Sequence, residues 1–147
     1  MLHIMQIVFT DKELLQSGTG VMDDDAPKEF QQTESGLKYR VLRKSDGRQP
    51  KAQDTVTVNY RGWLDSGKEF DSSRQRDQPF KFPVGMGMVI PGWDEGLQLL
   101  PVGTKATLVI PSKLAYGERG VPGSPIGANA ALVFEVEVLN VKPAKAE

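Results

Sequence analysis

Residues 56–73 constrain the fold of this chain more than any other segment, because they have the pattern of a β-hairpin. Along the first half, apolar side chains alternate with polar ones: Val56, Val58, Tyr60 and Leu64 against Thr57, Asn59 and Arg61. Residues 65–67 supply turn chemistry, since Gly67 can adopt a positive φ. A second strand over 68–73 carries Phe70 and Asp71 back toward Tyr60. An aromatic wall with a few polar groups is typical of a small-ligand site.

The rest of the folded part is predicted to be a sheet with one helix. Alternating patterns predict strands over 37–41, 53–64, 104–110 and 130–141, and residues 79–83 are predicted to be extended. The one convincing helix spans 91–100, where Trp93, Leu97 and Leu100 share a face. We therefore expect an α+β arrangement in which the helix covers the inner face of an antiparallel sheet.

The length of 147 residues predicts one domain with an arm. We assign residues 1–32 to an N-terminal arm and flexible linker, 33–143 to the folded domain, and 144–147 to a disordered tail. The linker assignment depends on Gly18, Gly20, the acidic run 23–25 and Pro27. The apolar stretch 1–9 has no preceding lysine or arginine and no small-residue cleavage pattern. We therefore expect a cytoplasmic protein.

Composition argues against several classes of function. The 18 basic and 19 acidic residues nearly balance, so nothing points to nucleic acid. The apolar runs are far shorter than the ~20 residues that span a bilayer, so no membrane segment is expected. The chain has no cysteine and one histidine, His3, at its extreme terminus. We therefore expect no cofactor, no metal site and no histidine-based triad.

Two glycine motifs resemble nucleotide-binding loops and fail in context. Residues 62–68 match most of a phosphate loop, but Glu69 stands where serine or threonine is needed, and a strand follows instead of a helix. Residues 85–87 lack the third glycine of a dinucleotide fingerprint. Asp94 and Glu95 are adjacent on a helix and point apart, so favourable helix-end charge is a better interpretation than a carboxylate pair.

The aromatic residues are open to two interpretations. Core packing is favoured for any single one of Phe70, Phe80, Phe82 and Phe134. For Trp93 the pattern leaves core and site evenly balanced. Tyr116 lies in a loop over 112–129 that is rich in glycine and proline, where packing gives less reason for a large aromatic, so a site role is favoured.

Taken together, six segments resemble the FKBP-type peptidyl-prolyl cis–trans isomerases, in the order of that family and near its spacing. They are residues 58–62, 67–73, Arg76 with 79–82, 89–97, 115–117 and 131–137. The resemblance covers about residues 37–141 and implies a bent antiparallel β-sheet wrapped around one short α-helix. It also implies catalysis of rotation about X–Pro bonds in an apolar aromatic pocket, which would assist protein folding.

The resemblance assigns residues to that pocket. The catalytic group it implies is Tyr60, Phe70, Asp71, Tyr116 and Phe134, with Asp71 as the polar group that faces the substrate. The substrate-binding group it implies is Arg76, Phe80, Val89, Ile90, Trp93 and Ile126. Trp93 would be the floor of the pocket, Val89 and Ile90 its rim, and Arg76 the partner of Asp71.

The resemblance has three departures: Met88 stands where some relatives carry an acidic residue, Leu114 where an aromatic is often found, and Val121 where some relatives carry histidine. They touch the rim and the loop, so they bear on substrate preference and inhibitor affinity more than on activity. The expected partners are proline-containing polypeptides and macrolide inhibitors of the FK506 kind, and the expected state is a monomer. Two other functions stay open: a non-catalytic module that anchors proline, and a holdase-type chaperone. The intact aromatic set argues against the first, and the second would need extra apolar surface.

Overall fold

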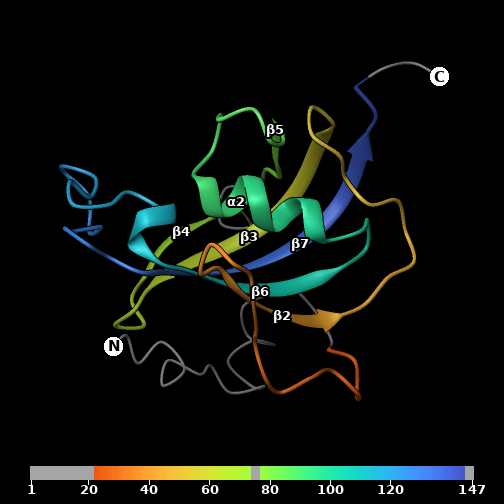
Figure 1. The fold of residues 1–147 in the computed structure, drawn as a ribbon, viewed down its shortest axis with the longest axis horizontal. Coiled ribbons are helices and arrows are strands. Elements are labelled where there is room, and N and C mark those ends of the chain that lie inside the picture. Colours follow the sequence, from red (N-terminus) through yellow and green to blue (C-terminus); the bar gives the residue numbers. More distant parts are fainter. Residues whose placement is uncertain (1–21, 74–76, 145–147) are drawn as a thin grey trace.

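The computed structural model describes residues 22–73 and 77–144. These residues form a seven-stranded antiparallel sheet with the order β1-β2-β6-β7-β3-β4, and β5 pairs with β3 off this path (Figure 1). The α+β class and the antiparallel sheet expected from the sequence are confirmed. No helix in the part of the chain described is long and apolar enough to cross a membrane.

Six of the seven strands lie where the sequence predicts strand or extended backbone, and the first, β1, lies in residues assigned to the arm and linker. Their bounds are β1 Gln31–Gln32, β2 Lys38–Arg43, β3 Thr55–Leu64, β4 Glu69–Ser72, β5 Phe80–Pro83, β6 Lys105–Ile110 and β7 Leu132–Lys142. The longest pairing joins β3 to β7, from Thr55 opposite Lys142 to Leu64 opposite Leu132. Along β3, Val56, Val58 and Tyr60 are buried while the intervening residues are half-buried, as a two-residue period requires.

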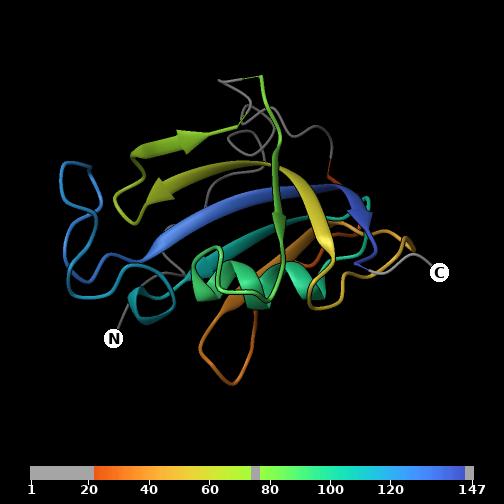
Figure 2. The same ribbon diagram turned by 90° about the horizontal axis from the view of Figure 1, so that it is seen from above.

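The helix predicted over 91–100 is divided in two. Helix α2 spans Pro91–Gly96, and the chain then tightens into the 3-10 helix η3, Leu97–Leu99. Figure 2 shows α2 on one side of the curved sheet, crossing its strands. Two glycines allow this close contact: a Cβ at Gly92 would lie 2.5 Å from Cγ2 of Ile110, and one at Gly96 would lie 3.1 Å from Cδ1 of Leu108.

The glycine-rich loop between β6 and β7 is ordered by its own backbone. It begins with the 3-10 helix η4, Ser112–Leu114, and the Asn129 N–H donates to the Gly117 carbonyl at 2.8 Å. The Val121 N–H donates to the Ile126 carbonyl at 2.9 Å, and the Ile126 side chain is buried in the core. The loop therefore has a fixed path over one end of the sheet.

Residues 22–32, which the sequence places in the arm and linker, contact the sheet. The Asp23 N–H donates to the Leu42 carbonyl at 2.9 Å, and β1 pairs with β2. Phe30 packs against a small cluster on the sheet face opposite α2, made of Trp63, Val109, Ala131 and Val133. Residues 1–21 and 145–147 lie outside the described residues, and the domain boundary at residue 33 stays a prediction.

Candidate functional site

Three aromatic side chains from three elements meet beneath α2, and we call them the floor: Tyr60 of β3, Trp93 of α2 and Phe134 of β7. They pack edge to face, with ring centroids 5.0 Å apart for Tyr60 and Trp93 and 5.2 Å apart for Trp93 and Phe134. Each is at most 7% exposed. Such pairs stabilise the folded state by about 0.5–1.5 kcal/mol each beyond the area that they bury, so the three rings support one another.

Two further phenylalanines, Phe70 and Phe80, pack against rings of the floor. The Phe70 ring of β4 meets Phe134 edge to face at 5.6 Å, and the Phe80 ring of β5 lies 6.1 Å from Trp93. Gly62 makes the first contact possible, because a Cβ there would lie 2.7 Å from Cε1 of Phe134 and 2.8 Å from Cζ of Phe70. In the sequence, Gly62 stands out only as part of a failed phosphate motif, and no local pattern indicates this requirement.

These side chains enclose a pocket of about 230 Å³. Its lining is Tyr60, Phe70, Asp71, Phe80, Met88, Val89, Ile90, Trp93, Tyr116 and Phe134. Nine of the eleven site residues predicted from the sequence therefore lie together, and Met88 joins them. Ile126 is buried in the core and is absent from the lining, and Arg76 lies outside the described residues. The catalytic and binding roles of these residues stay predictions.

Asp71 brings a carboxylate to the pocket wall in a fixed orientation. The Tyr60 hydroxyl donates to its Oδ2 at 2.5 Å, and the Ser72 N–H donates to its Oδ1 at 2.8 Å. Tyr116 lies across the mouth and is 43% exposed. Burial, and then the charge of Asp71, raise the pKa of the Tyr116 phenol. Its hydroxyl therefore keeps its proton to a higher pH than that of an ordinary tyrosine.

The remaining side of the mouth is a segment that we call the rim loop, residues 84–90. The Asp94 carboxylate accepts hydrogen bonds from the Gly85 N–H at 2.7 Å and the Gly87 N–H at 2.9 Å. Asp94 lies in the first turn of α2, where the sequence predicts a helix-end charge, and its carboxylate also binds the rim loop. The neighbouring Glu95 points elsewhere and accepts from the Ser35 hydroxyl, as expected for adjacent helical residues.

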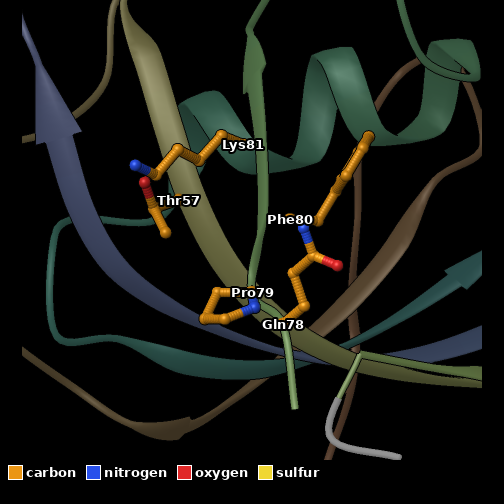
Figure 3. Close-up of a pocket in the computed structure, with 5 residues that line it drawn as sticks. All are labelled: Thr57, Gln78, Pro79, Phe80 and Lys81. Carbon is orange, nitrogen blue, oxygen red and sulfur yellow. The ribbon is translucent and has the colours of Figure 1, made fainter. Parts of the chain in front are cut away.

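A second hollow, of about 610 Å³, lies beside β5 (Figure 3). It is lined by Thr57, Gln78, Pro79, Phe80 and Lys81. Figure 3 shows the Phe80 ring directed toward α2 and away from Lys81. Phe80 is the one predicted site residue in this lining, and the carboxylate and the other aromatic rings belong to the smaller pocket, which we take as the functional site.

The chemistry available in the smaller pocket is that of binding and orientation. Its lining contains no cysteine, histidine, serine or lysine. Among residues 22–73 and 77–144, no group of three or more histidine, aspartate or glutamate side chains is placed to hold a metal ion. The site offers apolar faces to a ring of small size, one oriented carboxylate, and a phenol at the mouth.

Comparison with known proteins gives the same family throughout. Residues 46–139 match the family model described as FKBP-type peptidyl-prolyl cis–trans isomerase. A curated relative from Aeromonas hydrophila, FkpA, is 48% identical over 139 residues, which are 91% of this chain and 50% of the relative. FkpA of Escherichia coli K12 is 53% identical over 110 residues, which are 75% of this chain and 39% of the relative.

A shorter relative is covered almost completely. FK506-binding protein 1 of Debaryomyces hansenii is 52% identical over 102 residues, which are 69% of this chain and 90% of the relative. The crystal structure of FkpA from Escherichia coli superimposes with a TM-score of 0.74 at 45% identity, covering 92% of this chain and 59% of that one. The chain thus spans half or less of the length of the two bacterial relatives.

Proposed function

The chain belongs to the family of FKBP-type peptidyl-prolyl cis–trans isomerases, and we propose that it catalyses rotation about X–Pro bonds in the pocket above Trp93. The observation that carries the proposal is the floor of three buried, edge-to-face aromatic rings, with the Asp71 carboxylate held beside it by Tyr60. The natural substrates would be proline-containing segments of other polypeptides.

The reaction requires no nucleophile, metal or proton transfer. Rotation about the X–Pro amide must overcome the loss of resonance, a barrier of ~18–20 kcal/mol, and unaided it takes tens to hundreds of seconds. In the twisted state the amide loses conjugation and becomes less polar. A dry aromatic pocket binds that state better than the planar amide, and each ~1.4 kcal/mol of this difference accelerates rotation tenfold.

The geometry suggests a role for each group. Trp93 and Phe134 receive the pyrrolidine ring, since they are the most enclosed rings of the pocket. The twisted carbonyl would accept from the Tyr116 hydroxyl and from the Ile90 N–H, which has no hydrogen-bond partner within the described residues. Asp71 fixes the ring of Tyr60 through its hydroxyl and gives one wall of the pocket negative charge.

The same pocket supports a second proposal, that it binds macrolides of the FK506 kind. A relative that is covered over 90% of its length carries the name FK506-binding protein 1. Met88 lines the pocket and is 67% exposed, so the affinity would depend on this rim residue. The monomeric state and the cytoplasmic location remain predictions from the sequence.

A protease-coupled or NMR-exchange assay on a Leu-Pro peptide tests the proposed activity. We expect acceleration by the wild-type chain, competition by an FK506-type macrolide, and loss of activity in the double variant Trp93→Ala, Phe134→Ala. Trp93→Phe serves as the milder version that keeps the core filled. Its matched control is Trp63→Phe, because Trp63 is equally buried on the opposite face of the sheet.

The outcomes separate the candidate functions. Nearly full activity in the double variant would place catalysis outside this pocket. Peptide binding without acceleration by the wild-type chain would favour a non-catalytic module that anchors proline. Suppressed aggregation of an unfolded protein without either property would favour a holdase-type chaperone.

A further inference from the structure

We propose that Asp94 is a positioning residue for the isomerase reaction: its carboxylate holds the rim loop so that Met88 selects the side chain that precedes proline. The inference rests on the proposed function and goes beyond it, because it names a residue outside the pocket lining as the determinant of preference. Asp94 follows the floor residue Trp93 directly in sequence, so one turn of α2 supports both the floor and the rim.

The two ends of the rim loop are held by backbone hydrogen bonds. At the first end, the Gln53 N–H donates to the Val84 carbonyl at 2.8 Å, and the Val84 N–H donates to the Asp54 carbonyl at 2.9 Å. At the other end, the Ile90 carbonyl accepts from the Trp93 N–H at 2.9 Å. Between these ends, the Asp94 carboxylate accepts hydrogen bonds from two N–H groups of the loop.

We call the two hydrogen bonds from Gly85 and Gly87 to the Asp94 carboxylate the clamp, and the residue types in the loop fit it. One ionised carboxylate supplies two acceptor oxygens, and bonds to a charged acceptor are about twice as strong as neutral ones. Gly85 and Gly87 have φ of 76° and 72°, which non-glycine residues rarely adopt. Both N–H groups thereby turn toward Asp94, and the alternate residues turn outward: Met86 is 51% exposed and Met88 is 67% exposed.

Met88 is placed to contact the residue before proline. The pocket of about 230 Å³ takes a proline ring, so the adjoining side chain lies at the mouth, which Met88 lines with Tyr116. The unbranched thioether adapts its shape to large apolar partners. A fixed rim loop therefore favours leucine over alanine before proline, and a loosened loop loses that contact while the floor remains.

The experiment compares two substrates across two matched variants. Values of kcat/KM are measured for a Leu-Pro peptide and an Ala-Pro peptide with the wild-type chain, Asp94→Asn and Glu95→Gln. Glu95 lies on the same helical turn and loses the same charge, but it accepts from Ser35, which is remote from the rim loop in sequence. The ratio of the two substrates is the readout, because a general loss of folded protein does not change it.

We expect Asp94→Asn to lower kcat/KM for Leu-Pro about tenfold, as the loss of one charge-assisted hydrogen bond permits, and to lower it for Ala-Pro much less. Glu95→Gln should keep the wild-type ratio. Equal losses on both peptides, or the same change in Glu95→Gln, would overturn the role of Asp94.

Gly87→Ala tests the clamp without touching the carboxylate. No atom lies within 4 Å of the added Cβ, so the change acts through the positive φ alone. We expect the same fall in the Leu-Pro to Ala-Pro ratio and shifted amide NMR signals for Gly85; an unchanged ratio would contradict the proposal. If the wild-type chain does not isomerise either peptide, the proposed function fails. The clamp is then judged on the ratio of the two peptide dissociation constants, and an unchanged ratio in Asp94→Asn overturns it.

Discussion

The floor residues Tyr60, Trp93 and Phe134 are at most 7% exposed, whereas Met88 and Tyr116 at the mouth are 67% and 43% exposed. The floor is carried by β3, α2 and β7, and each ring contacts the other two. The mouth is carried by two loops, and the rim loop is held by the Asp94 carboxylate and by backbone bonds at its ends.

This difference divides stability from selectivity. Removing a floor ring leaves a cavity in the same core that holds the sheet to the helix, so stability and binding should fall together. Changing a rim side chain alters what the mouth contacts and leaves the core intact. The floor and the rim can therefore be changed separately by mutation.

The largest difference is expected between Phe134→Ala and Met88→Ala. Phe134→Ala should lower the free energy of unfolding by about 3–5 kcal/mol, because it removes a buried ring that touches Trp93 and Phe70. Met88→Ala should stay within about 0.5 kcal/mol of wild type, as surface changes usually do. Urea unfolding measures both. Similar losses in the two variants would mean that the rim loop is part of the core.

The second prediction concerns Asp54, which holds the first end of the rim loop, and the pH dependence of the stability that it contributes. Asp54, whose backbone holds Val84, has a buried carboxylate that accepts from the Lys51 N–H at 3.0 Å and the Ala144 N–H at 3.2 Å. The Lys51 N–H chiefly, with further help from Ala144 and Arg48, lowers the pKa of Asp54 against the opposing effect of burial. The ionised form of the Asp54 carboxylate is therefore stabilised by folding.

Asp54→Asn should lower the free energy of unfolding at pH 7 by about 1–3 kcal/mol, because buried donors lose a charged acceptor. A lowered folded pKa contributes stability above the unfolded value of about 3.9, and that stability is lost as the pH falls through the folded pKa. The difference in free energy of unfolding between Asp54→Asn and wild type should therefore shrink as the pH falls below about 4. Thermal unfolding at a series of pH values would measure it.

Asp25→Asn is the control for that experiment. The Asp25 carboxylate pairs with the Lys44 ammonium at 2.9 Å, but both side chains are 70% exposed. We expect no measurable change in melting temperature at any pH, since solvent screens such a pair. A gap at Asp54 that persists unchanged at low pH would contradict the assignment of its pKa.

The floor could be predicted from the sequence because alternation is a local signal. The two-residue period of residues 56–60 and 132–138 decides which side chains face α2. The pattern alone favours core packing for Phe134 and leaves Trp93 open, and it is the resemblance to the family that assigns both rings to a pocket, together with the loop residues. Ile126 is an exception, because its side chain is buried beneath the loop and does not reach the pocket lining.

The support of the rim could not be predicted, because it depends on backbone groups. The Asp94 carboxylate accepts from the N–H groups of two glycines. Which N–H groups face a carboxylate depends on the path of the backbone, and no pattern of side chains encodes that path. Gly62 is needed where two rings approach, which appears only once β3, β4 and β7 are adjacent. Strand β1 is two exposed glutamines and has no alternation, so the contact of residues 22–32 with the sheet left no pattern.

Tyr116→Phe should change stability little and activity more, so this one residue of the mouth separates the two properties. Tyr116 is 43% exposed, so the free energy of unfolding should change by less than about 0.5 kcal/mol. If its hydroxyl donates to the twisted carbonyl, kcat/KM should fall about two- to tenfold, the kinetic equivalent of one neutral hydrogen bond. Tyr39→Phe is the control, because the Tyr39 hydroxyl donates to Gln31 on the exposed edge of the sheet.

The pH profile of Tyr116 separates its hydroxyl from its ring. Burial first, and then the charge of Asp71, hold the pKa of Tyr116 above the ordinary value of 10.0, so the hydroxyl loses its proton at a higher pH than an ordinary tyrosine does. Ultraviolet titration should record that raised pKa, and Asp71→Asn should bring it part of the way down, because burial remains. Wild-type kcat/KM should fall as the pH rises through this raised pKa, at a higher pH than for an ordinary tyrosine. A Tyr116→Phe variant with the full wild-type rate would assign the carbonyl contact to the Ile90 N–H instead.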